Sequence, residues 1–209
     1  MVGRIIQTLD CVAEGAAWLA ASNPSFARAL AVCDPLPLRR QQDGFAALLQ
    51  AIVGQQVSVA SARAIWARLL AAGVTDPLVM AGTKDEALRG LGLSRQKARY
   101  GLALAQAEID FDGLRSQPND VVIATLVAVP GIGLWTAEIY VMFALGRADV
   151  FAPGDLALQE AARMLFGLEL RPTDRQLRAM AVAWSPWRSV AARILWAYYR
   201  VAKERDGVV

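Results

Sequence analysis

The sequence contains no histidine among its 209 residues. Catalytic triads and dyads that depend on an imidazole, and metal sites with histidine ligands, are therefore excluded within this chain. Only two cysteines are present, Cys11 and Cys33. Two thiols cannot hold a four-cysteine zinc site or a cysteine-ligated iron–sulfur cluster, and they are too few for a secreted disulfide framework. The cysteine content therefore favours a reducing cytosol.

Long apolar runs that could cross a membrane are also missing. The longest uncharged run, Gly44–Ala62, spans 19 residues and contains three glutamines and two serines, which makes it too polar for a spanning helix. A second run, Val121–Ala137, is interrupted by one proline and two glycines. The N-terminus lacks the basic segment and apolar stretch of a signal peptide. We expect a cytoplasmic protein that does not enter a membrane.

The residues that are present indicate a helical protein with a large core. Hydrophobic residues make up 56% of the chain and charged residues 20%, which excludes disorder. The net charge of +3 permits a nucleic-acid partner without requiring one. Apolar residues recur every three or four positions, as over 45–53, and the only strand-like triplet is Val121–Ile123. We predict an all-α fold of about ten helices in two lobes, with the chain crossing between them near Asp34–Arg40 and Arg147–Gly154.

A glycine-rich turn between two predicted helices is the most informative segment. Leu126–Ala137 reads Leu-Val-Ala-Val-Pro-Gly-Ile-Gly-Leu-Trp-Thr-Ala. Two glycines allow a sharp turn and a close approach of the backbone to another molecule. The start of the second helix presents backbone N–H groups and a positive dipole end, which together favour an anion such as phosphate. Carbonyls of the turn could also hold a monovalent cation. On glycine content alone, a plain corner between two helices fits equally well.

A single carboxylate downstream of this turn has a setting that fits catalysis. Asp155 follows Pro153-Gly154 and precedes an apolar helical segment, so it is expected to cap that helix. Caps are common, and the cap alone explains the residue. The alternative is a fixed carboxylate that faces a cleft, where it could stabilise an oxocarbenium ion or activate a water molecule. Glu138 is a reserve candidate that we expect to be solvated or paired with a cap.

Four segments in this order resemble the helix–hairpin–helix base-excision DNA glycosylases. They are the hairpin with Asp155 placed 20 residues after Trp135, the segment Ala-Ile-Val-Gly-Gln-Gln-Val-Ser-Val-Ala at 51–60, the segment 92–102 that begins Gly-Leu-Ser, and Pro-Trp-Arg-Ser-Val-Ala at 186–191. The resemblance covers about residues 45–199 and is strongest to the 3-methyladenine DNA glycosylase II type. It implies an all-α fold in which two helical lobes flank a DNA-binding cleft. One lobe would be residues 43–147, with the helix–hairpin–helix at about 126–142, and the other residues 1–42 plus 148–209, with the catalytic aspartate.

The resemblance also implies a reaction. The chain would be a monofunctional DNA glycosylase that flips alkylated purines, such as 3-methyladenine and 7-methylguanine, out of the duplex and excises them by hydrolysis in base excision repair. Asp155 would be the catalytic aspartate. Bifunctional members of the family place a Schiff-base lysine where this sequence has Trp135, so water should be the nucleophile here. A non-catalytic helix–hairpin–helix DNA-binding protein, an endonuclease III-like lyase and an all-α scaffold for protein partners are the alternatives.

By the same resemblance, the base pocket would contain aromatic rings, because a cationic base prefers a π-rich surface. We expect these rings to be Trp135, Trp187 and Tyr140. Residues expected to contact DNA are Gln55, Gln56, Lys97, Pro130, Gly131, Ile132, Gly133, Thr136, Arg188 and Ser189. The carbonyls of Val127, Val129 and Ile132 are the expected ligands of a structural Na⁺ or K⁺, and no other cofactor is expected. The partner would be double-stranded DNA with alkylated bases, and the protein a cytoplasmic, nucleoid-associated bacterial monomer.

Overall fold

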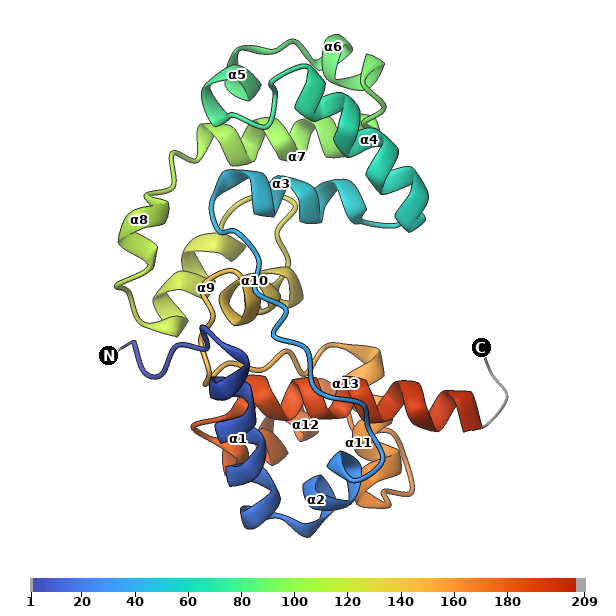
Figure 1. Cartoon of the computed structure of the whole chain (residues 1–209). Helices are drawn as coiled ribbons and strands as arrows, with labels where there is room; N and C mark the ends of the chain where they lie inside the picture. The colour runs from blue at the N-terminus through green and yellow to red at the C-terminus, as the bar shows by residue number, and fades with distance from the viewer. Residues whose placement is uncertain (1, 206–209) are drawn as a thin grey trace. The chain divides into compact units, whose positions relative to one another are not determined.

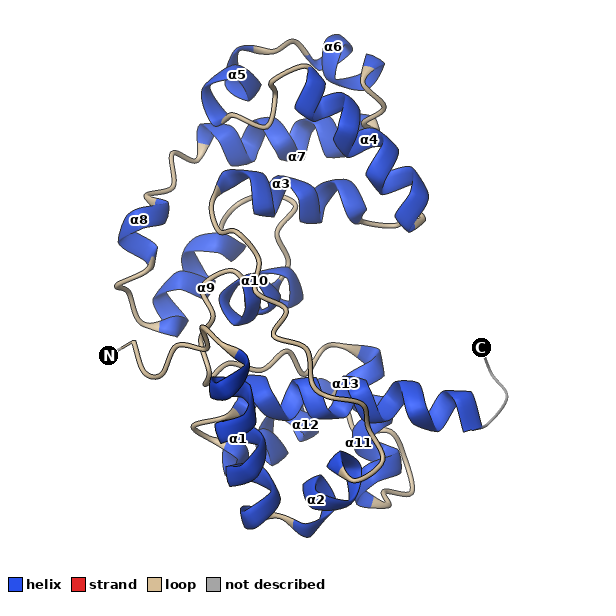
Figure 2. Cartoon of the chain, in the orientation of Figure 1, coloured by secondary structure: helices blue, strands red, loops and turns tan. Residues whose placement is uncertain are grey.

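The structure is a computed structural model that describes residues 2–205. Within these residues there are thirteen α-helices, one short 3-10 helix and no strand (Figure 2). The all-α prediction is confirmed, and the triplet Val121–Ile123 lies inside helix α9 (Asn119–Val127). The extra helices relative to the predicted number include three short ones of six, six and four residues, α5 (Pro77–Gly82), α6 (Asp85–Gly90) and α8 (Phe111–Leu114).

The chain forms two compact units, which we describe separately. The first comprises residues 41–140, and the second comprises residues 2–40 with the chain from 141 onward. The sequence predicts these boundaries at 42/43 and 147/148. Residues 141–147 pack with the N-terminal segment in the second unit, since the Arg147 N–H donates to the Val141 carbonyl and the Arg147 side chain donates to the Val2 carbonyl.

The first unit is built around helix α3 (Phe45–Gly54), which packs against α4 (Val59–Ala71) and α7 (Arg95–Gln106) (Figure 1). The apolar face of α3 is fully buried, and helix α7 approaches it closely at Gly101. A β-carbon at Gly101 would lie only 3.2 Å from the Leu49 side chain, so a small residue is needed there. The short helices α5, α6 and α8, with α9 and the start of α10 (Leu134–Phe143), complete this unit.

The second unit is organised by the long C-terminal helix α13 (Arg188–Arg205), which packs against α1 (Leu9–Ser22), α2 (Pro24–Leu30) and α11 (Leu156–Phe166) (Figure 1). Helix α12 (Asp174–Met180) and the 3-10 helix Ala181–Trp184 lie between α11 and α13 in the chain. Phe26, Phe151 and Phe166 surround Trp184 at ring distances of 5.2–5.8 Å. This aromatic cluster fixes α2 and α11 relative to the 3-10 helix.

Candidate functional site

The hairpin that the sequence predicts is present between α9 and α10. The Ile132 N–H donates to the Val129 carbonyl at 3.1 Å, which closes a tight turn. Gly131 has a φ of +94°, a conformation that L side chains rarely adopt, and a β-carbon there would overlap the Tyr100 ring. Nothing lies within 4 Å of a β-carbon built on Gly133. The turn therefore needs glycine at position 131, whereas the backbone at position 133 is open to an approaching molecule.

Three of the sequence motifs meet around this hairpin in the first unit. The Gln55 side chain donates from Nε2 to the Gly131 carbonyl at 3.0 Å, which joins the Gln-Gln segment to the turn. A groove of about 580 Å³ runs along this junction. Its lining residues come from the Gln-Gln segment, the start of α7 and the turn, and they are Gln55, Gln56, Val57, Ser94, Gln96, Lys97, Tyr100, Gly131, Ile132 and Gly133. Eight of the residues predicted to contact DNA or a cation lie here or in the adjoining turn: Gln55, Gln56, Lys97, Val129, Pro130, Gly131, Ile132 and Gly133.

Two residues of this groove have conformations or contacts that sequence patterns do not show. Gln56 is exposed and has a φ of +55°, an uncommon value for a residue other than glycine. Lys97 donates from Nζ to the Val53 carbonyl at 2.7 Å, at the end of α3, and burial lowers the pKa of its ammonium. Lys97 therefore supports the Gln-Gln segment in addition to lying in the groove. Its predicted contact with phosphate stays a prediction.

A separate cavity of about 420 Å³ opens between α3 and α10 in the same unit. Trp135 and Tyr140 both line it, as does Thr136. Trp135 is 47% exposed, whereas Tyr140 is 4% exposed. Residues of this lining that the sequence analysis did not single out are Gln41, Ala47, Leu48, Gln50, Ala51, Gly54 and Ile139. The cavity thus combines two aromatic rings with several amide side chains.

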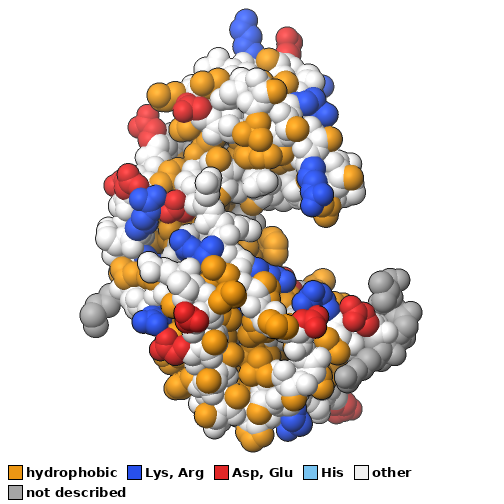
Figure 3. Space-filling view, viewed as in Figure 1, with side chains coloured by type: hydrophobic (Ala, Val, Ile, Leu, Met, Phe, Trp, Pro, Cys, Tyr) orange, Lys and Arg blue, Asp and Glu red, His pale blue; other side chains and the backbone are white. Residues whose placement is uncertain are grey.

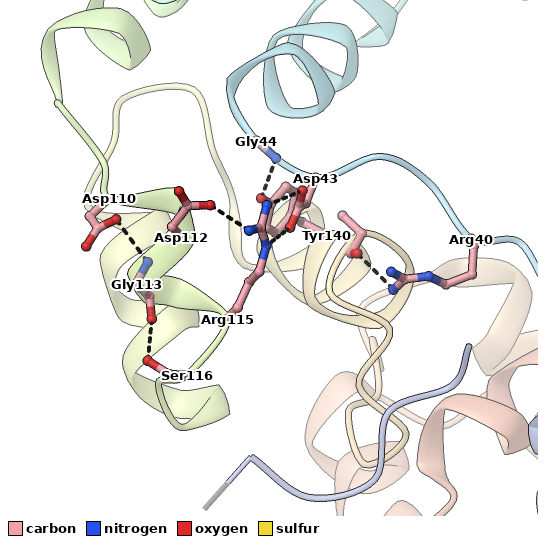
Figure 4. A network of polar contacts seen from close by, with 10 residues as sticks. Arg40, Asp43, Gly44, Asp110, Asp112, Gly113, Arg115, Ser116 and Tyr140 are labelled. Carbon is pink, nitrogen blue, oxygen red and sulfur yellow. Dashed lines mark hydrogen bonds and ion pairs between the residues drawn. The ribbon is translucent and has the colours of Figure 1, made fainter.

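The buried phenol of Tyr140 is held by a polar network that Figure 4 shows. Its hydroxyl accepts a hydrogen bond from the Gly44 N–H at 2.8 Å, and burial raises the pKa of Tyr140 to about 12. Asp43 precedes Gly44 and forms a two-point ion pair with Arg115, at 2.7 and 3.0 Å. Arg115 also contacts Asp112, and the Asp43 carboxylate raises the pKa of Arg115. The network therefore anchors the segment before α3 beside the cavity.

Two of the predicted site residues at the end of the sequence belong to the interior of the second unit. Trp187 is 5% exposed and packs on Gly15, where a β-carbon would lie 2.6 Å from its ring. Ser189 is 0% exposed, and its hydroxyl accepts a hydrogen bond from Arg193 at 2.6 Å. The Trp187 ring thus packs in the core of the second unit, and the Ser189 hydroxyl has a structural partner. The predicted contacts of Trp187 with a base and of Ser189 with DNA stay predictions.

Two charged residues that the sequence analysis names are paired or buried in the structure. Arg188, a predicted DNA contact, forms an ion pair with Asp149, with Nε and Oδ1 2.8 Å apart, and Ser185 donates to the same carboxylate. Glu138, which we expected to be solvated or paired with a cap, is 1% exposed. The prediction that Glu138 is solvated is therefore wrong, because its position on α10 directs the side chain into the interior of the protein.

Asp155 caps helix α11, as the sequence predicts. Its Oδ1 accepts hydrogen bonds from the N–H groups of Ala157 and Leu158 at 2.9 and 3.1 Å. The indole of Trp196 donates to the same oxygen at 3.3 Å. The buried side chain of Gln159 donates to the Pro153 carbonyl at 2.8 Å and so holds the turn before the aspartate. Three N–H donors converge on one carboxylate oxygen, which holds the Asp155 side chain in one orientation.

Sequence reasoning missed Trp196, the aromatic residue that lies beside Asp155. It is half-buried in α13, one turn before Arg200, and its ring lies 5.8 Å from that of Phe143. The Pro-Trp-Arg-Ser segment instead predicts Trp187 as the aromatic residue of the site. Nine positions separate the two tryptophans, and only the helix geometry shows which of them reaches the aspartate.

The described residues contain no group of three or more His, Cys, Asp or Glu side chains that could hold a metal ion. The three hairpin carbonyls predicted to bind Na⁺ or K⁺ belong to Val127, at the end of α9, and to Val129 and Ile132 in the turn. Neutral carbonyl oxygens suit a monovalent cation better than a transition metal. Among the helices described, none is long and apolar enough to cross a membrane.

Comparisons with known proteins find relatives that are similar in sequence and in fold. The DNA-3-methyladenine glycosylase 2 of Escherichia coli is 32% identical over 168 residues, which is 74% of this chain and 57% of that protein. The chain spans less than two thirds of the length of this and other curated relatives. The crystal structure of a DNA-3-methyladenine glycosidase from Bacillus halodurans is 32% identical, with a TM-score of 0.79 over 89% of both chains.

A further solved structure contains DNA. The 3-methyladenine DNA glycosylase of Schizosaccharomyces pombe, in complex with abasic DNA, is 25% identical, with a TM-score of 0.73 over 88% of this chain and 95% of that chain. The sequence profile of one superfamily matches residues 49–187, which include the hairpin and Asp155. The chain belongs to the HhH-GPD superfamily of base excision DNA repair proteins.

Proposed function

We propose that this protein is a monofunctional DNA glycosylase that removes alkylated purines, such as 3-methyladenine and 7-methylguanine, from double-stranded DNA. The observation that carries the proposal is the fixed carboxylate of Asp155, on whose Oδ1 three N–H donors converge. A plain helix cap needs only the two backbone donors. The third donor, Trp196, supplies an orientation that a catalytic carboxylate requires. The names of the relatives from E. coli and S. pombe support the same reaction.

The chemistry of alkylated purines suits a chain without histidine. Alkylation at N3 or N7 places a positive charge on the base, which then leaves without protonation by a general acid. The Asp155 carboxylate stabilises the positive charge that develops on the sugar as the N-glycosidic bond breaks, and it orients the attacking water. The bond between C1′ and the base nitrogen is broken, and a C1′–OH bond forms. The strand itself remains uncut.

The first unit supplies binding groups for such a substrate. In this proposal the backbone around Gly133 binds a DNA phosphate, and Gln55 and Gln56 lie against the gap that a flipped nucleotide leaves. The exposed Gln56 has a strained φ, as functional residues often do. The rings of Trp135 and Tyr140 receive the base in the 420 Å³ cavity, which is large enough for a purine.

A monovalent cation completes the hairpin in this proposal. The carbonyls of Val127, Val129 and Ile132 would hold Na⁺ or K⁺, and the ion would add a positive charge beside the bound phosphate. No other cofactor takes part in the reaction. The protein acts as a monomer in the cytoplasm, where its partner is the chromosomal duplex.

A base-release assay tests this function. Wild-type protein is incubated with a duplex that contains 7-methylguanine or 3-methyladenine, with EDTA present, and the free base and the strand are analysed. We expect free base and an intact abasic strand, without a covalent adduct on borohydride reduction. A trapped adduct would indicate a lyase instead. DNA binding without base release from any alkylated duplex would support the non-catalytic DNA-binding alternative.

A further inference from the structure

An arginine near Asp155, Arg39, stacks on an aromatic ring but forms no hydrogen bond or ion pair with the described protein groups. Arg39 lies in the segment that follows α2 and has a φ of +52°. A residue other than glycine pays a conformational cost in this region, and such residues concentrate at functional sites. Hydrogen bonds at the two adjacent residues, Leu38 and Arg40, hold this segment in place without a contribution from Arg39. Arg40 donates to the Ala144 carbonyl at 2.9 Å (Figure 4), and Arg193 donates to the Leu38 carbonyl at 2.9 Å.

The Arg39 guanidinium is positioned next to the catalytic carboxylate. It lies 5.3 Å above the ring of Trp196, whose indole N–H donates to Asp155. Arg200 follows Trp196 by four residues on α13, so it lies one turn farther along the same helix face. Burial and the nearby Arg200 lower the pKa of Arg39, and Asp155 raises it. Arg39 and Arg200 therefore lie near each other, with the Asp155 carboxylate close to Arg39.

Both side chains are exposed and keep their donors available. Among residues 2–205, neither the Arg39 nor the Arg200 guanidinium forms a hydrogen bond or an ion pair with another protein group. On the face shown in Figure 3, Lys and Arg side chains are scattered among hydrophobic, Asp and Glu side chains. Two neighbouring guanidinium groups with unused N–H donors are a suitable site for a phosphate, which accepts at two oxygens.

We propose that Arg39 and Arg200 together bind one phosphodiester of the DNA strand that carries the damaged base. The phosphate would relieve the repulsion between the two cations and would place the backbone of that strand beside Asp155. This inference rests on the proposed function, because it assumes that DNA is the ligand. Arg39 and Arg200 are binding and positioning residues, since neither touches the bond that breaks.

The test measures binding to a duplex with a tetrahydrofuran abasic-site analogue by fluorescence anisotropy, over a range of KCl concentrations. The double variant Arg39→Gln/Arg200→Gln should bind about tenfold more weakly than wild type, and its slope of log K against log[salt] should be smaller by ~0.9, the value for one phosphate contact. Arg28→Gln, which removes an exposed arginine from α2 in the same unit, should keep the wild-type slope. A double variant with the wild-type slope would overturn the proposal.

A second arm identifies the phosphate and checks the fold. Single neutral methylphosphonate linkages are placed around the abasic analogue, one in each duplex. At one linkage wild type should lose about tenfold in affinity, and the double variant should lose nothing further. Equal losses for both proteins at every linkage would overturn the proposal. The Tm of the double variant should lie within about 2 °C of that of wild type, because both side chains are exposed and neither guanidinium forms a hydrogen bond or an ion pair.

The outcomes of these arms are independent of catalysis. If wild type releases no base but the salt slope and the methylphosphonate pattern are as expected, the phosphate site stands and the glycosylase proposal fails. If wild type releases base and the slope is unchanged in the double variant, the phosphate site fails and the glycosylase proposal stands.

Discussion

The two glycines of the hairpin should respond in opposite ways to the same substitution. Gly131 has a φ of +94°, and a β-carbon there overlaps the Tyr100 ring, whereas a β-carbon at Gly133 meets nothing within 4 Å. Gly131→Ala should therefore destabilise the first unit, because the alanine must adopt a left-handed conformation and displace an aromatic ring. Gly133→Ala should leave the fold intact and reduce DNA binding, since the methyl group projects where the phosphate approaches.

The expected size of the effect follows from two contributions. A left-handed φ costs an alanine about 1–2 kcal/mol. Forcing a methyl group into a packed neighbour costs about 1–3 kcal/mol more. The free energy of unfolding should thus fall by about 2–5 kcal/mol for Gly131→Ala, which corresponds to a lower Tm by about 4–20 °C. For Gly133→Ala, the change should stay within about 0.5 kcal/mol.

Thermal and urea unfolding, followed by circular dichroism, measure these differences, and anisotropy with an abasic-site duplex measures binding. We expect Gly133→Ala to bind DNA about tenfold more weakly, as when one hydrogen bond to a charged group is lost. If Gly131→Ala unfolds at the wild-type temperature, the conformational argument is refuted. If Gly133→Ala is as unstable as Gly131→Ala, the idea of an open backbone at position 133 is wrong.

Three further changes test other parts of the structure. Burial raises the pKa of Tyr140 to about 12, so between pH 10 and pH 12 the native phenol keeps a proton that the unfolded phenol loses. The contribution of Tyr140 to the free energy of unfolding should therefore be complete below pH 10 and fall by roughly 2 kcal/mol toward pH 12. Urea titrations of Tyr140→Phe should lack this part of the fall. Trp135→Ala should reduce base release at least about tenfold in a single-turnover assay while the Tm changes little, because the ring is 47% exposed. Gly15→Ala should lower the free energy of unfolding by about 1–3 kcal/mol in urea, since its methyl group meets the ring of Trp187 at 2.6 Å.

The features that the sequence predicts correctly are those with a local physical cause. The hairpin is visible because Gly131 and Gly133 are local signals for an unusual backbone. The cap at Asp155 is visible because proline, glycine and aspartate precede an apolar helix. The all-α fold follows from apolar residues at helical spacing. Each of these depends on neighbours within a few positions of the chain.

The features that the sequence misses depend on which side of an element faces the protein. Trp187 and Trp196 belong to one motif region, yet Trp187 packs on Gly15 of α1, and Trp196 reaches Asp155. Ser189 is buried under Arg193, which binds a carbonyl from a segment more than 150 positions away. Such contacts join distant parts of the chain, so no spacing rule within the motif could place these side chains.

The central claim is that Asp155 drives hydrolysis of the N-glycosidic bond. Asp155→Asn is a suitable variant, because asparagine caps helices as well as aspartate does and can accept the same N–H donors at Oδ1. The decisive measurement is the single-turnover rate of base release from an alkylated duplex, with affinity for an abasic-site duplex measured on the same preparations. We predict unchanged affinity and a rate that falls at least about a hundredfold. A variant that excises the base at the wild-type rate would contradict the account.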